Sequence, residues 1–154
     1  MPSLRRATVN DLETVFQLRI EFLSDVWGSD GFSNTALVNS TRAYIERQLP
    51  SNQLRVWFAE EHGEIVATGA MIFFDRMPTM DNPLGLEAYL LSVYTRKEHR
   101  GRGIAPMIMK AMIAHAREAG AGRVFLHASD AGRPVYEKLG FTATKFEMDL
   151  YFTK

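Results

Sequence analysis

The 154-residue sequence contains no cysteine. It therefore offers no disulfide framework, no thiolate nucleophile and no cysteine-based metal site. It also has no apolar run of membrane-spanning length, and its first residues, MPSLRRATVNDLE, lack the apolar stretch that a secretory signal carries after its arginines. We therefore expect a cytoplasmic protein that does not bind membranes.

Neither sign of charge predominates, because 18 basic side chains are balanced by 18 acidic ones. A chain without excess positive charge is not expected to bind nucleic acid. Basic residues do gather locally, between Arg96 and Arg102, and such a short cluster suits a small polyanion. No group of histidines and carboxylates has metal-ligand spacing, so we expect no metal.

The length and the apolar fraction of 46% are those of one soluble globular domain. We see no repeat, low-complexity tract or linker, and expect residues 1–154 to form a single domain. Hydrophobic periodicity and turn residues predict the order β-α-α-β-β-β-α-β-α-β. The expected strands are 4–8, 54–60, 65–74, the stretch from Glu87, 124–128 and 146–152; the first two helices start at Asn10 or Asp11 and at Ser33 or Asn34, and turn-rich loops cover 27–34 and 77–85.

The stretch from Glu87 to Gly120 reads EAYLLSVYTRKEHRGRGIAPMIMKAMIAHAREAG, which predicts a strand, a glycine-bearing basic turn and a helix. Ile104, Ile108 and Met112 recur at the four-residue spacing of one helix face. The first N–H groups of a helix have no internal partner and lie at the positive end of its dipole. The turn is therefore a candidate phosphate site, with donors expected from Arg102, Gly103, Ile104 and Ala105.

Two common phosphate-binding patterns do not fit this turn. After Gly101 and Gly103 no third glycine follows at the spacing of the dinucleotide fingerprint. The G-x-x-x-x-G-K-[ST] run is absent as well. A nucleotide-binding domain of either type is therefore not indicated.

A different pattern does match. The strand ending L-L-S-V-Y, followed by R-K-E-H-R-G-R-G-I-A and a helix, resembles the coenzyme A pyrophosphate loop of the GCN5-related N-acetyltransferase (GNAT) family. A second stretch, SDAGRPVYEKLGF at residues 129–141, resembles the next segment of that family. The two motifs occur in the family's order and at its separation. The resemblance implies the GNAT fold, a mixed α/β domain with a mostly antiparallel central sheet flanked by helices.

The resemblance also implies acetyl-CoA as co-substrate and a set of residues that hold it. The backbone of Leu91, Ser92 and Val93 is expected to bind the pantetheine arm and the thioester carbonyl. The pyrophosphate is expected at the turn, and Ser129 is a further candidate that could equally be a helix cap, like Asp130. The turn residues are Arg100, Gly101, Arg102, Gly103, Ile104 and Ala105. Glu98 departs from the family pattern, but backbone donors carry this binding.

For catalysis, the resemblance places Tyr136 at the family's tyrosine position, where its hydroxyl would protonate the leaving thiolate. The alternative is a half-buried structural tyrosine. The base that takes the proton of the acceptor amine is left open between Glu87, His127 and a chain of water molecules. We name Tyr136 and Glu87 as the catalytic candidates.

The expected function is transfer of an acetyl group from acetyl-CoA to a primary amine, on a small molecule or a protein, by direct attack in a ternary complex. The alternative is a non-catalytic coenzyme A-binding regulatory or sensor module. We expect the acceptor beneath the first two helices and the two loops, where Trp27, Asp30, Phe32 and Asp81 hint at a cationic or aromatic-contacted amine. The sequence names neither the amine nor the acyl length, and it leaves open whether the chain is a homodimer.

Overall fold

The computed structural model describes residues 1–152. Five strands form one sheet in the order β1-β2-β3-β4-β5. Neighbouring strands are antiparallel except β5, which runs parallel to β4. This confirms the predicted mixed α/β fold with a mostly antiparallel sheet. The strands are β1 (Ser3–Arg6), β2 (Leu54–Glu61), β3 (Glu64–Asp75), β4 (Leu86–Thr95) and β5 (Arg123–Leu126).

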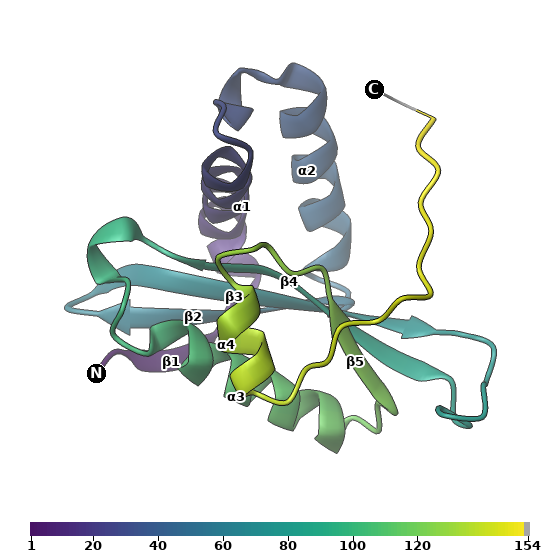
Figure 1. Ribbon diagram of the computed structural model, residues 1–154. Coiled ribbons are helices and arrows are strands. Elements are labelled where there is room, and N and C mark those ends of the chain that lie inside the picture. Colours follow the sequence, from purple (N-terminus) through teal and green to yellow (C-terminus); the bar gives the residue numbers. More distant parts are fainter. Residues whose placement is uncertain (153–154) are drawn as a thin grey trace.

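Helices cover both faces of the sheet, with α1 and α2 on one face and α3 and α4 on the other (Figure 1). Each face has its own apolar core, one centred on Phe16, Ile20 and Phe58, the other on Ile108, Met109 and Met112. The helices are α1 (Leu12–Trp27), α2 (Thr35–Gln48), α3 (Ile104–Glu118) and α4 (Arg133–Lys138), with the short 3-10 helices η1 (Val9–Asp11), η2 (Gly31–Ser33) and η3 (Lys97–His99).

Polar side chains satisfy free N–H groups at the start of α2 and at the start of the short helix η1, which leads into α1. The N–H of Leu37 donates to Oδ1 of Asn34 at 3.1 Å, which confirms Asn34 as the cap of α2. Before α1, Thr8 and Asp11 form a capping box around η1, in which the N–H of Thr8 donates to Oδ2 of Asp11 at 2.7 Å. Asp11 is the N-cap of α1, which is one of the two predicted starting residues.

The predicted last strand at residues 146–152 is wrong, because the structure has no strand there. The apolar residues that alternate in this stretch, Phe146, Met148, Leu150 and Phe152, are at least 80% exposed. The segment runs away from the sheet as an extended tail (Figure 1). Alternation makes a strand possible, but a strand also needs the hydrogen bonds of a neighbour, and none pairs with this tail within residues 1–152.

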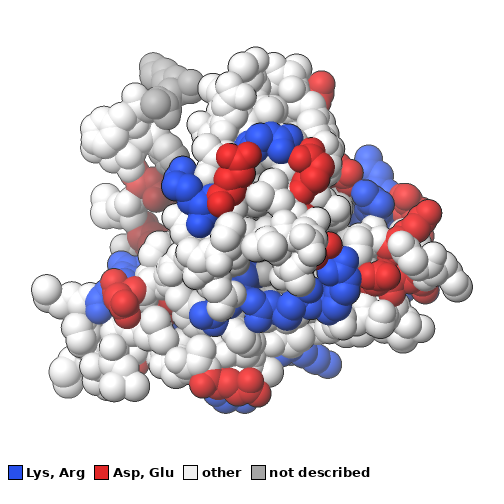
Figure 2. All heavy atoms as spheres, turned by 180° about the vertical axis from the view of Figure 1, so that it is seen from behind, with Lys and Arg blue, Asp and Glu red and all other residues white. Residues whose placement is uncertain are grey.

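Charged side chains of both signs share the surface seen from behind, where acidic groups border a band of basic ones (Figure 2). Several charged side chains of the molecule form ion pairs, such as Arg42 with Glu13 and Arg5 with Asp11. Within the described chain, no helix is both long and apolar enough to cross a bilayer.

Candidate functional site

The turn between β4 and α3 has the geometry of an anion site. Gly101 and Gly103 adopt φ angles of 75° and 76°, in the left-handed region that favours glycine, and Gly103 is the N-cap of α3. A Cβ at either glycine would meet no atom within 4 Å, so open space lies above the backbone. Within residues 1–152, no acceptor pairs with the N–H groups of Gly101, Arg102 and Gly103. These free donors, with those of Ile104 and Ala105 in the first turn of α3, can bind an anion.

The arginine side chains of this turn form ion pairs with other elements, whereas its backbone N–H groups stay free within the described chain. Arg100 donates from Nη2 to Oδ2 of Asp25 at 2.9 Å, which ties the turn to α1. Arg102 donates to both carboxylate oxygens of Glu61 at 2.9 and 2.6 Å, which ties it to β2, and this pairing lowers the pKa of Glu61 to about 2. The sequence predicted these arginines as ligand contacts. In the structure they anchor the turn and leave its N–H groups free.

Strand β4 bulges immediately before this turn. Leu91 lies opposite Ala70 and Tyr94 opposite Thr68, so two residues, Ser92 and Val93, face a single residue of β3. Ser92 has a φ of +53°, which is rare outside glycine, and it is buried. The bulge removes this part of β4 from regular pairing and turns its backbone groups toward other partners.

The same part of β4 also leaves β5. Pairing of the two strands ends at Leu90 with Leu126, and no pairing continues between Leu91 and His127. Leu91, Ser92 and Val93, predicted to contact the cofactor, therefore lie where the sheet opens between its two helical faces. The structure thus brings this backbone segment and the α3 turn together at one end of β4.

A cavity of about 470 Å³ opens on the face covered by α1 and α2. Its walls are mainly apolar side chains of β2, β3 and β4, and its polar lining includes Arg19, Tyr44, Tyr89 and Ser92. Nη1 of Arg19 donates to Oγ of Ser92 at 2.9 Å. Sequence reasoning missed Arg19, although it lies four residues after the buried Val15 on the inward side of α1.

The loop residues predicted to surround the acceptor do not line this cavity. Trp27 is 79% exposed, and Asp30 uses its carboxylate to accept the N–H of Phe32 at 2.9 Å. Asp81 lies on the rim of a different cavity. A cavity does lie below α1 and α2, where the acceptor was expected, but none of these loop residues lines it. Where the acceptor binds stays a prediction.

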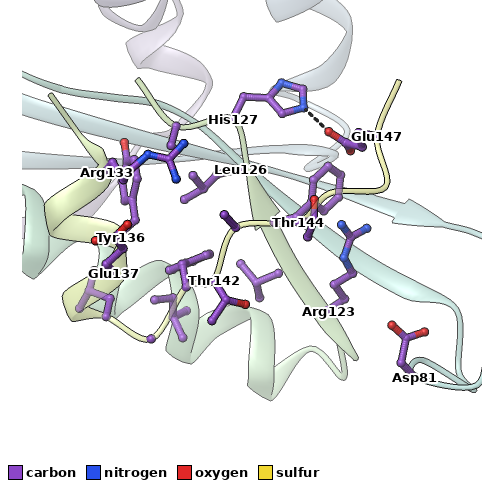
Figure 3. A pocket seen from close by; sticks show the side chains of 18 of the residues that line it. Asp81, Arg123, Leu126, His127, Arg133, Tyr136, Glu137, Thr142, Thr144 and Glu147 are labelled. Carbon is purple, nitrogen blue, oxygen red and sulfur yellow. Dashed lines mark ion pairs between the residues drawn. The ribbon is translucent and has the colours of Figure 1, made fainter. Parts of the chain in front are cut away.

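The second cavity, of about 670 Å³, lies beside β5 and α4. Tyr136 and Arg133 line one side and Arg123 the other (Figure 3). Burial raises the pKa of Tyr136, and its ring contacts Phe141 edge-on at 6.2 Å between centroids. Within the described residues, the Tyr136 hydroxyl has no hydrogen-bond partner, so it is free to donate to a ligand.

Ser129 acts within the turn that precedes α4. Its Oγ accepts the N–H of Gly132 at 3.2 Å, and its carbonyl accepts the N–H of Arg133 at 3.0 Å. These bonds hold the turn before α4 and so help to position Tyr136. The N-cap of α4 is Gly132, with no side-chain cap bond, so the capping alternative for Ser129 is wrong. A contact of Ser129 with a cofactor stays a prediction.

Glu87 and His127 occupy different environments on the α1 side of the sheet. Glu87 is buried, and its Oε2 accepts from Nη1 of Arg76 at 3.0 Å and from Nη1 of Arg123 at 3.2 Å. His127 is exposed; its Nδ1 lies 3.3 Å from the Tyr89 hydroxyl, and its Nε2 lies 3.5 Å from Oε2 of Glu147 (Figure 3). Of the two residues, His127 is the one linked to the cavity below α1 and α2, because its partner Tyr89 lines that cavity.

Comparison with known proteins gives consistent matches. A family model described as the acetyltransferase (GNAT) family matches residues 12–141. A predicted acetyltransferase from Clostridium acetobutylicum, solved with acetyl-CoA, is 33% identical with a TM-score of 0.90, over 98% of this chain and 96% of the other. A GCN5-related N-acetyltransferase from Ralstonia eutropha is 27% identical with a TM-score of 0.90, over 99% of both chains.

A mouse protein named probable N-acetyltransferase family 8 member 5 is also similar, at 30% identity over 116 residues. The match covers 71% of this chain but 46% of the mouse protein. The chain thus corresponds to about half the length of that curated relative.

Proposed function

The chain belongs to the acetyltransferase (GNAT) family, and on that premise we propose that it transfers the acetyl group of acetyl-CoA to a primary amine. The observation that carries this proposal is the turn before α3, where free N–H groups face open space directly after the bulge of β4. Such donors match the pyrophosphate of coenzyme A. The solved relative with acetyl-CoA supports the same co-substrate.

In this proposal the amine nitrogen attacks the thioester carbon directly. A backbone N–H within Leu91–Val93 stabilises the oxyanion that forms on the carbonyl oxygen. The carbon–sulfur bond then breaks, the thiolate takes the proton of the Tyr136 hydroxyl, and solvent returns a proton to the phenolate. Burial raises the pKa of Tyr136, and its hydroxyl, protonated at neutral pH like that of any tyrosine, has no hydrogen-bond partner among the described residues. No enzyme-bound acetyl intermediate is needed.

The proton of the acceptor amine needs a route from the cavity to solvent. We place it at Tyr89 and His127, because Tyr89 lines the cavity and lies 3.3 Å from the exposed imidazole. The base role of Glu87 stays a prediction. Its carboxylate holds two arginines, and protonating it would leave both without their partner, so its contacts favour a structural role.

We further propose that the chain forms a homodimer through its tail. The outer edge of β5 has no partner strand within residues 1–152, and the cavity beside it contains the apolar side chains of Ile113, Val124 and Leu126. The tail's alternating apolar residues would fit that edge in a second copy. Light scattering should find a dimer for the full chain and a monomer after removal of residues 145–154; a monomeric full chain would contradict the proposal.

A thiol-release assay tests the proposed activity. Because the chain has no cysteine, a thiol reagent reports only the coenzyme A that is released. We expect acetyl-CoA cleavage that depends on an added amine, with mass spectrometry showing the acetylated product. The panel should include amino acids, polyamines, aminoglycosides and peptide N-termini. Tight acetyl-CoA binding without turnover on any of these would favour a regulatory coenzyme A-binding module instead.

A further inference from the structure

The cavity below α1 and α2 carries a single charged side chain, Arg19, among the described residues that line it. The other polar groups there are neutral, such as Tyr44, Tyr89 and Thr68, and no carboxylate lines the cavity. A cationic acceptor would find no counter-charge in this space. The single positive charge that lines the cavity instead favours a negatively charged group of a ligand.

Within the described residues, Arg19 forms no ion pair, and its guanidinium donates one hydrogen bond, to Oγ of Ser92. Nearby arginines differ: Arg42 pairs with Glu13 at 2.7 Å and Arg100 with Asp25 at 2.9 Å. Burial lowers the pKa of Arg19, yet a guanidinium keeps its proton in proteins. A partly buried cation without a counter-ion is costly, and an anion brought by a ligand would relieve that cost.

We propose that Arg19 binds a carboxylate of the acceptor, so that the acceptor is an amino acid or a closely related amine with its carboxylate near the nitrogen. This inference rests on the proposed acetyl transfer. One guanidinium balances one negative charge, and its planar fork matches a carboxylate, whereas a phosphate monoester carries nearly two charges and would need further cations.

The position of Arg19 sets the distance between the carboxylate and the amine of the proposed acceptor. Its Nη1 contacts Ser92, the bulge residue at which the acetyl carbonyl is expected. A carboxylate held there brings an amine on the adjacent or next carbon to the transfer point. The apolar walls from Val56, Ile72 and Leu91 would then contact an apolar side chain of the same molecule.

The test compares matched acceptors that differ only by the carboxylate. L-Phenylalanine is set against phenethylamine, and L-leucine against isoamylamine, with wild type, Arg19→Gln and Arg19→Lys. Charge-assisted hydrogen bonds predict that wild type prefers the amino acid by ~10–100-fold in kcat/KM. Arg19→Gln should bring that ratio close to one, and Arg19→Lys should retain part of it. Arg117→Gln on the exposed side of α3 serves as the matched control and should keep the full ratio.

A binding measurement separates this inference from the proposed activity. N-acetyl-L-phenylalanine and N-phenethylacetamide are titrated into the protein with coenzyme A present and followed by NMR. Carboxylate-dependent binding that Arg19→Gln abolishes supports the inference even if no amine is turned over, in which case the proposed activity fails. Turnover of amines with no effect of the carboxylate on rate or binding overturns the inference and leaves the activity intact. Thermal melts of each variant confirm that it is folded.

Discussion

Arg19 of α1 and Ser92 of β4 are joined by a hydrogen bond of 2.9 Å between Nη1 and Oγ. The bond connects the wall of the cavity below α1 and α2 to the residue at which β4 bulges. One helix therefore helps to fix both the cavity that we propose for the amine and the backbone that we propose for the thioester. The α3 turn is tied to the same helix through Arg100 and Asp25.

We expect Gly103→Val to abolish binding of acetyl-CoA while the domain stays folded. A β-branched residue at φ +76° is strained, and its side chain would fill the open space above the free N–H groups. Gly120→Val is the matched control, because Gly120 has φ +86°, is equally open and lies just past the other end of α3. Calorimetry should show lost binding of acetyl-CoA in Gly103→Val only. Equal affinities of the two variants for acetyl-CoA would contradict binding of the pyrophosphate by the backbone N–H groups of the turn.

Tyr136→Phe should lower kcat by ~10²-fold or more with little change in KM for acetyl-CoA, because the hydroxyl acts only as the thiolate leaves. Tyr151→Phe removes the same atom from an exposed tyrosine and should have no effect. Steady-state kinetics on a turned-over amine measure both constants. Full kcat in Tyr136→Phe, with chemistry shown to be rate-limiting, would instead support a structural tyrosine.

Glu87→Gln distinguishes the two roles open to this carboxylate. Its contacts with Arg76 and Arg123 predict a loss of about 1–2 kcal/mol in the free energy of unfolding, reduced by the partial exposure of both arginines, and a kcat within a few-fold of wild type. Urea denaturation and steady-state kinetics on the same preparation check both. A large loss of kcat at unchanged stability would restore Glu87 as the base.

Asp11 should make stability depend on pH. Its hydrogen bonds with Arg5 lower its pKa from 3.8 to about 2, so its carboxylate stabilises the fold above pH 3.8 and that stabilisation is lost as the pH falls through about 2. Asp11→Asn should cost about 1–2 kcal/mol at pH 7, after allowance for the exposure of Arg5. The free energies of unfolding of Asp11→Asn and wild type should converge as the pH falls toward 2. The control Asp149→Asn should match wild type already at pH 7.

Local sequence patterns predicted most of the helices and strands, because the interactions behind each pattern join residues that are close in the sequence. The 3.6-residue periodicity around Ile104, Ile108 and Met112 and the cap at Asn34 depend on a few neighbouring residues. The strand predicted from the alternation at residues 146–152 was wrong, because a strand also needs a partner strand, which is distant in the sequence and cannot be identified from a local pattern. The turn between β4 and α3 was likewise predictable from Gly101, Gly103 and the following helix, while its binding of coenzyme A stays a prediction.

Long-range contacts were not predictable. The ties from Arg100 to Asp25 and from Arg102 to Glu61 join residues 75 and 41 positions apart. Arg19 reads in the sequence as one more polar residue in an amphipathic helix, and only the packing of α1 on β4 brings it against Ser92. The positive charge in the cavity below α1 and α2 therefore could be identified only from the structure.

Titration of acetyl-CoA into the purified chain by calorimetry, alongside thermal melting, tests the central claim most directly. We expect saturable binding with one site per chain and a dissociation constant below about 1 mM, and a melting temperature that rises with ligand concentration by mass action. Absence of both binding heat and a melting shift at millimolar acetyl-CoA would contradict the claim that the turn before α3 holds coenzyme A.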